Sequence, residues 1–220
     1  MPSPLKIGFL LYPYLTQLDL TGPAQVFAAA TNTQLHFVWK NRSPVQSDAG
    51  IQLMPTDTFE SCPALDVLCV PGRPGQGRWM QDAQVLGWLS AQGKNAAWVT
   101  SVCSGSLLLG AAGLLHGYRA ASHWNYREFL KLFGSEADAA RVVRDRNRIT
   151  GGGVTAGIDL ALTVLAEAMG EDEAKQVQLL LEYAPQPPFD CGRPELAGRA
   201  VTALVQERLE AQRKHAEEMM

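Results

Sequence analysis

The chain has 220 residues, of which 46% are hydrophobic and 19% charged, and its formal net charge is −3. This length is sufficient for one domain with a full core, and the near-balanced charge gives no field that would attract nucleic acid or an anionic membrane. The first residues lead directly into a strand pattern rather than a signal peptide, and no apolar run reaches the roughly 18 residues of a membrane span. We therefore expect a small-molecule partner, and neither nucleic acid nor a membrane.

Apolar runs bounded by turn signals alternate with helical periodicity, which indicates parallel strands joined by crossover helices. The predicted strands and hairpins cover residues 6–12, 35–39, 45–54, 65–70, 96–101 and 142–149. The predicted helices cover residues 21–30, 79–92, 124–133, 155–169, 172–183 and 195–219, with a further apolar helix directly after Cys103. In the first helix, Thr21 is expected to cap the N-terminus and Pro23 to occupy the first turn.

These elements predict an α/β fold with a mostly parallel sheet and helices on both faces, of the flavodoxin-like kind. We expect one domain over residues 1–194, followed by a C-terminal helix and a tail over residues 195–220 that frays at Met219 and Met220. Four cysteines lack both CxxC pairing and zinc-type spacing to histidine; they are Cys62, Cys69, Cys103 and Cys191. We interpret them as free thiols in a reducing cytoplasm, with no metal site.

Cys103 is the candidate nucleophile because it lies between a buried strand and an apolar helix. Helix dipoles and unpaired N–H groups at a helix N-terminus favour thiolate over thiol. A fall of about 1.5 units from a thiol pKa of about 8.5 would make the side chain mostly anionic at neutral pH. The alternative is that Cys103 is a buried apolar residue, since cysteine is among the most buried residue types.

The loops after three predicted strands carry Asp19, Gly72 and Cys103. If these strands are parallel, the loops converge at the edge of the sheet where α/β proteins bind ligands. Asp19 is flanked by leucines, and apolar surroundings next to a thiolate would raise the pKa of its carboxyl and make it a proton donor. Alternatively, Asp19 caps the following helix or lies in solvent.

Two further polar features have structural explanations. His123 could orient a base, but a structural histidine before a helix explains it as well. An alternating basic run predicts the solvated face of a hairpin; it comprises Arg141, Arg144, Arg146 and Arg148.

A set of motifs, spread from about Lys6 to about Pro188, resembles the ThiJ/PfpI superfamily of the class I glutamine amidotransferase-like fold. The motifs are Leu18-Asp19-Leu20-Thr21-Gly22-Pro23, Val70-Pro71-Gly72, Ser101-Val102-Cys103-Ser104-Gly105-Ser106, Ala121-Ser122-His123-Trp124, Thr150-Gly151-Gly152-Gly153 and Leu181-Glu182-Tyr183-Ala184-Pro185. Within the superfamily the chain is similar to the members that hydrate isonitriles, because many other relatives have glutamate in the segment of Asp19. Peptidase-like relatives also have histidine directly after the cysteine, where this chain has Ser104.

The resemblance implies that an isonitrile, R–N≡C, is hydrated to an N-substituted formamide without a metal or redox cofactor. Asp19 would protonate the isonitrile carbon while Cys103 adds to it, and Asp19 would then activate water against the resulting thioimidate. Backbone N–H groups of Gly72 and Ser104 would stabilise the developing charge. The resemblance also implies a homodimer, and it gives a supporting or binding role to Thr21, Gly22, Ser104, Gly72, Arg73 and His123.

Two positions depart from the pattern of the isonitrile-hydrating members. Ser104 stands where threonine is expected, so the hydroxyl is kept but a methyl that restricts its rotamer is lost. Arg73 stands where a second glycine is expected, and it adds bulk and charge near the site.

Two other functions are compatible with the same motifs. The first is another thiol-dependent activity of the superfamily, such as glyoxalase or deglycase chemistry on dicarbonyls or protection against oxidative stress. The second is a ligand-sensing domain, because relatives with a similar cysteine turn are fused to helix-turn-helix regulators. The residues after Pro194 are too few for two helix-turn-helix motifs, which disfavours a regulator.

Overall fold

The computed structural model describes residues 3–218. Within that range a seven-stranded sheet has the order β10-β11-β7-β6-β1-β2-β5. Its strands are β1 (Leu5–Leu10), β2 (Thr33–Trp39), β5 (Asp57–Thr58), β6 (Val67–Val70), β7 (Trp98–Ser101), β10 (Val142–Asp145) and β11 (Arg148–Gly151). All neighbouring pairs are parallel except β10 and β11, so the predicted mostly parallel sheet is confirmed.

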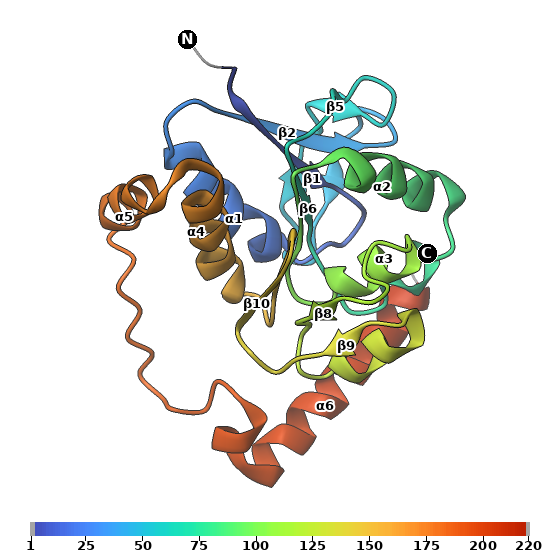
Figure 1. Ribbon diagram of the computed structural model, residues 1–220. Coiled ribbons are helices and arrows are strands. Elements are labelled where there is room, and N and C mark those ends of the chain that lie inside the picture. The colour runs from blue at the N-terminus through green and yellow to red at the C-terminus, as the bar shows by residue number, and fades with distance from the viewer. Residues whose placement is uncertain (1–2, 219–220) are drawn as a thin grey trace.

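Helices cover both faces of this sheet, as predicted: α1, α4 and α5 lie on one side and α2 and α3 on the other (Figure 1). The helices are α1 (Gln17–Ala29), α2 (Ala83–Asn95), α3 (Gly105–Ala111), α4 (Ala156–Met169), α5 (Glu171–Leu180) and α6 (Pro194–Glu218), with 3-10 turns η1 (Gln76–Arg78) and η2 (Arg127–Phe133). Two short two-stranded ribbons complete the described elements: β3 (Val45–Gln46) with β4 (Gln52–Leu53), and β8 (Arg119–Ala120) with β9 (Glu136–Ala137). The predicted hairpins at residues 45–54 and 142–149 are therefore confirmed.

The central strands are apolar on both faces because helices cover both. Every residue of β6 is buried, as are the last four residues of β1. Such continuous apolar runs are typical of parallel strands in α/β proteins. The core therefore extends through the sheet, and the loops at the carboxyl ends of its strands are anchored to rigid elements.

The start of α1 differs from the prediction. The helix begins at Gln17, so Thr21 is not its cap but lies one turn inside, where its hydroxyl donates to Gln17 Oε1 at 2.8 Å. Asp48, in the β3–β4 ribbon, accepts a hydrogen bond from the Gln17 amide at 3.1 Å and satisfies an unpaired N–H of the first turn. This contact spans 31 residues, so no local pattern could reveal it.

Other helix ends also differ from the prediction. The helix predicted from residue 79 begins instead at Ala83, because the Asp82 side chain accepts from the amides of Gln84 and Val85. The segment predicted as helical over residues 124–133 is a 3-10 turn over Arg127–Phe133. Helix α5 ends at Leu180 rather than at residue 183.

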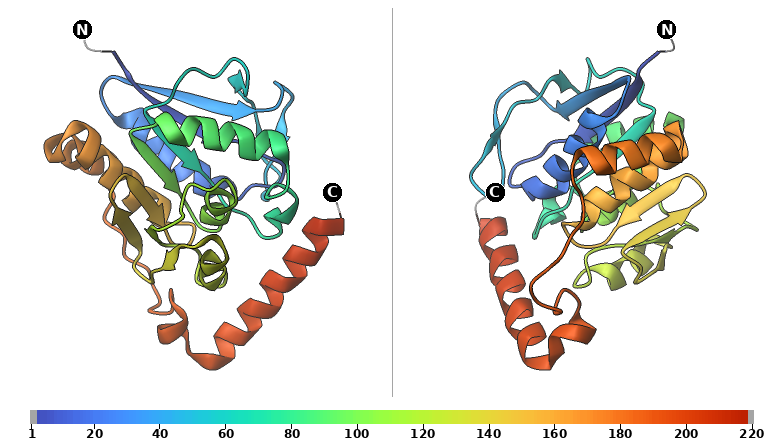
Figure 2. Two further views of the ribbon diagram at one scale, coloured as in Figure 1. Left: turned by 45° about the vertical axis from the view of Figure 1, so that its right-hand side comes forward. Right: turned by 90° about the vertical axis from the view of Figure 1, so that its left-hand side faces the viewer.

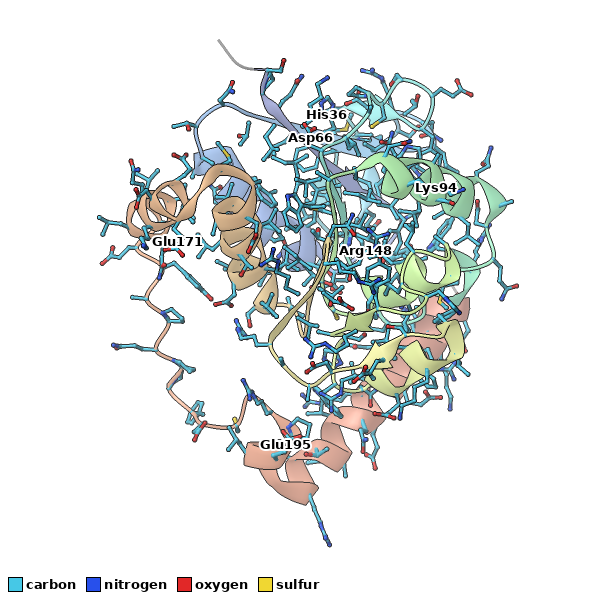
Figure 3. The ribbon with its side chains drawn as sticks, viewed as in Figure 1. His36, Asp66, Lys94, Arg148, Glu171 and Glu195 are labelled. Atoms are coloured by element: carbon cyan, nitrogen blue, oxygen red, sulfur yellow. The ribbon has the colours of Figure 1, made fainter. Side chains whose placement is uncertain are left out.

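The basic run in the β10–β11 hairpin is not wholly solvated. Arg148 is buried, and its Nε donates to the Leu114 carbonyl at 2.8 Å. Figure 3 places Arg148 within the body of the molecule, whereas Glu195 lies at the outer end of α6. The prediction of a solvated face was therefore wrong for Arg148.

The C-terminal helix lies outside the layered body. An extended strap over residues 181–193 connects α5 to α6, and α6 then runs along the outside of the domain (Figure 2). Gly198, with φ 76°, interrupts the helix near its start. The helix thus begins close to the predicted residue 195; the predicted fraying at Met219 and Met220 lies outside the described residues.

Candidate active site

The three loops predicted to converge do so, because β7, β6 and β1 are neighbours in the sheet. Cys103 follows β7, Gly72 follows β6, and Asp19 lies in the first turn of α1, shortly after β1. All three residues are buried. The carboxyl end of the sheet thus brings together a thiol, a carboxyl group and a tight backbone turn.

Cys103 occupies a sharp turn between β7 and α3. Its φ is 58°, a left-handed conformation that a non-glycine residue adopts at a cost of about 1–3 kcal/mol. The turn is held by its own backbone, since the Cys103 amide donates to the Gly152 carbonyl at 2.7 Å and its carbonyl accepts from Ser122 Oγ at 3.1 Å. This arrangement is a nucleophile elbow, in which backbone strain presents one side chain at the end of the sheet.

Asp19 is 1% exposed, and only one of its two carboxyl oxygens has a partner of good geometry among the described residues. Oδ2 accepts the Gly72 amide proton at 2.8 Å, whereas Oδ1 is buried without a hydrogen-bond partner. Burial raises the pKa of Asp19 to about 8; the Gly72 hydrogen bond opposes this rise, and the charge of Asp48 adds to it. The pKa of Asp19 is raised, as predicted. The negative charge that adds to this rise is that of Asp48, whereas the prediction attributed it to a Cys103 thiolate.

The pKa of Cys103 moves opposite to the prediction. Burial raises the pKa of the Cys103 thiol well above its ordinary value, and the charge of Asp19 adds to the rise. The neighbouring amide and hydroxyl of Ser104 oppose this rise. The prediction of a resting thiolate was therefore wrong: α3 has only seven residues, and its dipole does not outweigh the loss of water around a buried sulfur.

Asp19 and Cys103 form an interacting pair. The interaction between their side chains lowers the pKa of Asp19 and raises that of Cys103. Because the groups share protons, they titrate as a pair rather than independently. A pair that keeps its protons at neutral pH can both donate a proton and accept one back.

Gly72 does not offer its N–H to a substrate, because that donor is already bonded to Asp19. A side chain at this position would not fit: a Cβ on Gly72 would lie 2.5 Å from the Ser104 amide nitrogen and 2.7 Å from its Oγ. Glycine therefore allows the β6 loop to pack directly on the elbow. The prediction that Gly72 stabilises the developing charge has to be replaced by a role in holding Asp19.

Arg73 is buried and connects neighbouring loops rather than projecting into solvent. Its guanidinium donates to the Pro13 carbonyl at 2.7 Å and to the Pro74 carbonyl at 2.9 Å, and it lies over the Tyr14 ring. Its amide donates to Ser104 Oγ at 3.0 Å. The large side chain of Arg73 thus connects the β1–α1 loop to the β6 loop.

Thr21, Gly22 and His123 are the remaining predicted site residues. Gly22 allows close packing of α1 on α4, since a Cβ there would lie 3.2 Å from Ile158. Thr21 bonds within α1, as described above. His123 accepts the Asn125 amide proton on Nδ1 at 3.3 Å, and burial lowers its pKa to about 4, so the ring is neutral at physiological pH.

Two hollows flank the loops that carry the pair. One, of about 330 Å³, has Tyr14, Asp48 and Arg73 on one side and Gln212, His215 and Ala216 of α6 on the other. The second, of about 500 Å³, is lined by His123, Gly152 and neighbouring residues, including Glu195 and Leu196 at the start of α6. Within residues 3–218 no group of three or more His, Cys, Asp or Glu side chains could hold a metal ion, and no helix is long and apolar enough to cross a membrane.

Gln76 is a residue that the sequence analysis missed. It is 4% exposed, and its amide nitrogen donates to the Ser104 carbonyl at 2.9 Å. The Ser104 hydroxyl lies 2.9 Å from Gln76 Oε1. No sequence signal pointed to Gln76, because its two contacts are with a residue 28 positions away.

Three features define the class of this protein. They are an α/β sheet, a cysteine at a nucleophile elbow, and a buried carboxyl group paired with that cysteine. Residues 5–167 match the DJ-1/PfpI family, and the chain is a member of that family. The chain is 56% identical to the isonitrile hydratase of Pseudomonas putida over 197 residues, which cover 90% of this chain and 86% of that protein.

Solved structures and more distant relatives agree with this assignment. A ThiJ/PfpI family protein from Pseudomonas syringae has a TM-score of 0.92 at 44% identity, with 98% of this chain and 90% of that chain covered. The transcriptional regulator GbdR of Pseudomonas aeruginosa is 28% identical over 82% of this chain, which spans only 51% of the regulator. Drosophila melanogaster DJ-1beta shares the fold, with a TM-score of 0.76 at 21% identity over 84% of this chain and all of that chain.

Proposed function

We propose that this protein is an isonitrile hydratase, which adds water to R–N≡C to give R–NH–CHO. The observation that carries the proposal is the 56% identity to the Pseudomonas putida enzyme over 90% of the chain. The paired Asp19 and Cys103 supply the two groups that the reaction requires. An isonitrile carbon becomes electrophilic only as it gains a proton, so an acid and a nucleophile have to reach the same carbon.

The first step uses the pair in the form that holds a single proton. Asp19 gives that proton to the isonitrile carbon while the Cys103 sulfur forms the new C–S bond, and R–N=CH–S–Cys results. The unpartnered Oδ1 is the oxygen available for this transfer, because Oδ2 is engaged by Gly72. Asp19 ends the step as a carboxylate, which its hydrogen bond from the Gly72 amide stabilises.

The second step uses that carboxylate as a base. Asp19 takes a proton from water as the hydroxide adds to the thioimidate carbon, and the nitrogen then receives that proton. The tetrahedral intermediate loses its hydroxyl proton to Asp19 and expels the Cys103 sulfur, which releases R–NH–CHO and restores the pair with one proton. No metal or redox cofactor takes part in these steps.

Three further properties belong to this proposal. The enzyme acts in the cytoplasm, which is supported by the presence of all four cysteines as free thiols. It works as a homodimer, for which exposed apolar side chains such as Leu179, Leu180 and Phe189 provide contact surface. Ser104, Arg73 and His123 support or line the site rather than react.

The test is a hydration assay of the purified protein with an alkyl and an aryl isonitrile, in which formamide is followed by chromatography. Formamide formed by the wild type and not by Cys103→Ala supports both the reaction and the nucleophile. Methylglyoxal is the control substrate for the dicarbonyl activity. Turnover of methylglyoxal without any formamide from several isonitriles would overturn the proposal, and binding of isonitriles without turnover would favour a sensing domain.

A further inference from the structure

The loop between β11 and α4, residues 152–155, holds the backbone of the nucleophile. The carbonyl of its first residue, Gly152, accepts the Cys103 amide proton at 2.7 Å. Cys103 has a φ of 58°, a conformation that persists only where the surrounding structure enforces it. The orientation of the nucleophile therefore depends on where the Gly152 carbonyl is held.

Arg141, the residue before β10, contacts this loop at both ends. Its main-chain carbonyl accepts the Gly152 amide proton at 2.9 Å. Its guanidinium donates to Thr155 Oγ1 at 3.3 Å and, from Nε, to Asp159 Oδ2 in the first turn of α4 at 2.7 Å. A single residue thus joins the start of the loop to the helix that follows it.

The strap that leads to α6 adds a third group to this cluster. The Tyr183 hydroxyl donates to the same oxygen of Asp159 at 3.1 Å. Tyr183 belongs to the motif over residues 181–185, to which the catalytic steps proposed above give no role. Asp159 thus accepts hydrogen bonds from both the hairpin and the strap, and we refer to Arg141, Asp159 and Tyr183 as the clasp.

We propose that the clasp positions the nucleophile, because it fixes the loop whose Gly152 carbonyl holds the Cys103 amide. Its three residues touch no reacting atom in any contact described above, so they are positioning residues rather than catalytic ones. The effect of the clasp on turnover rests on the proposed isonitrile hydration. Its effect on the reactivity of the thiol does not, and can be measured without an isonitrile.

A second ion pair between β10 and α4 provides a matched comparison. Arg144 Nη1 lies 2.7 Å from Glu167 Oε1, and Arg141 Nη2 lies 2.6 Å from Asp159 Oδ2. The two arginine side chains are exposed to similar extents, 51% and 42%. Glu167 lies about two turns further along α4, and within residues 3–218 neither it nor the Arg144 side chain bonds to residues 152–155.

The first measurement compares the steady-state kinetics of Arg141→Met and Arg144→Met with a soluble alkyl isonitrile. Each variant keeps the aliphatic part of the side chain and loses one ion pair between the same two elements. We expect Arg141→Met to lower kcat by about 3–10-fold and to leave KM within about twofold, less than the roughly 10²-fold that a misplacement of about 1 Å can cost. Arg144→Met should change neither quantity, whereas a general loss of stability would affect both variants.

The second measurement is the rate at which iodoacetamide alkylates Cys103, followed by mass spectrometry. Cys103 is 5% exposed, so its alkylation requires a local opening of the site. We expect alkylation to be about two- to fivefold faster in Arg141→Met, the scale of one exposed ion pair, and unchanged in Arg144→Met. Loss of a positive charge would by itself disfavour the thiolate and slow the reaction, so a faster rate reports the opening.

Double variants decide whether the clasp acts as a unit. Asp159→Ala removes the acceptor shared by Arg141 and Tyr183, and should lower kcat at least as much as Arg141→Met. In the Asp159→Ala background, Arg141→Met and Tyr183→Phe should have no further effect on kcat. Asp159→Asn is the replacement if Asp159→Ala does not fold.

Equal kcat values or equal alkylation rates in Arg141→Met and Arg144→Met would overturn the proposal. So would effects of Arg141→Met that persist undiminished when residue 159 is alanine. A wild type that forms no formamide would overturn the proposed function instead, and the alkylation rates alone would then decide whether the clasp holds the nucleophile.

Discussion

The Gly72 amide nitrogen lies 2.8 Å from Oδ2 of Asp19, and this buried hydrogen bond joins the β6 loop to the first turn of α1 across 53 residues of the chain. It fixes one carboxyl oxygen and leaves Oδ1 for proton exchange. It also favours the ionised carboxyl, against the burial that favours the neutral one. The balance gives Asp19 a pKa of about 8, where a carboxyl group can act first as acid and then as base.

Asp19 and Cys103 should each be required for turnover. We expect Cys103→Ala to abolish formamide production, because no other group in the site can form the covalent bond. Asp19→Asn keeps the shape of the side chain but removes its proton transfer, and should lower kcat by about 10²–10⁴-fold, the usual contribution of a general acid–base. Steady-state kinetics with a soluble alkyl isonitrile measures both effects, and circular dichroism checks that the variants are folded. A near wild-type rate in Asp19→Asn would refute its catalytic role.

We expect Gly72→Ala to disturb the site by a steric clash with Ser104 alone. The added Cβ would lie 2.5 Å from the Ser104 amide nitrogen, a contact that forces either the β6 loop or the elbow to move. We expect a loss of about 1–3 kcal/mol in the free energy of unfolding, typical of overpacking, together with a lower kcat. Denaturant unfolding and the formamide assay measure these effects.

The matched control for that variant is Gly87→Ala. Gly87 lies within α2, and a Cβ there would meet nothing within 4 Å. Alanine is favoured over glycine inside a helix, so this variant should gain about 0.5–1 kcal/mol of stability and keep full activity. Equal effects of the two substitutions would show that the contact between Gly72 and Ser104 has no importance for the site.

The sequence was sufficient to predict the central strands of the sheet and the convergence of the three loops, but not the short edge strand β5. β6 is a continuous apolar run, β1 is apolar and buried over its last four residues, and β7 is buried from Val99 to Ser101. Buried strands of this kind can be recognised in a sequence because helices cover both faces of a parallel sheet. Parallel pairing then requires Asp19, Gly72 and Cys103 to lie at the same edge. That part of the site follows from local patterns together with one rule of topology.

Other features depend on contacts between distant segments. The start of α1 is set by the Asp48 side chain, which comes from a separate ribbon. The side chain of Gln76 is positioned by its hydrogen bond to Ser104, which lies in another loop. Whether the pKa of Cys103 is raised or lowered depends on how deeply the sulfur is buried, and a strand–turn–helix pattern does not indicate burial depth.

Arg73→Met should loosen the connection between the loops that carry the pair. The substitution keeps much of the buried volume but removes the hydrogen bonds from the guanidinium to the carbonyls of Pro13 and Pro74. We expect the free energy of unfolding to fall by about 1.5–3 kcal/mol, the scale of a hydrogen bond from a charged group, and kcat to fall more than KM rises. Arg42→Met, at an exposed position, is the control and should change neither quantity. Wild-type stability and kcat in Arg73→Met would show that the two hydrogen bonds do not hold the site.

The dependence of kcat/KM on pH should follow the proton count of the Asp19–Cys103 pair. Burial raises the pKa of both groups, so at neutral pH the free enzyme holds mostly two protons, and the reactive form, with one, is the minor species. Raising the pH removes the first proton, so kcat/KM should rise through pH 8, the pKa of Asp19, and level off above it. It should fall again at higher pH, when the second proton is lost and no acid remains to protonate the isonitrile.

The assay for this prediction is the initial rate at low isonitrile concentration across pH, with a buffer series of constant ionic strength. In Asp19→Asn the rising limb near pH 8 should disappear from whatever activity remains, because the group that titrates there has been removed. If kcat/KM were instead highest in acid and fell through pH 8, the pair would have to react with both protons in place. The carboxylate would then be excluded as the base that activates water.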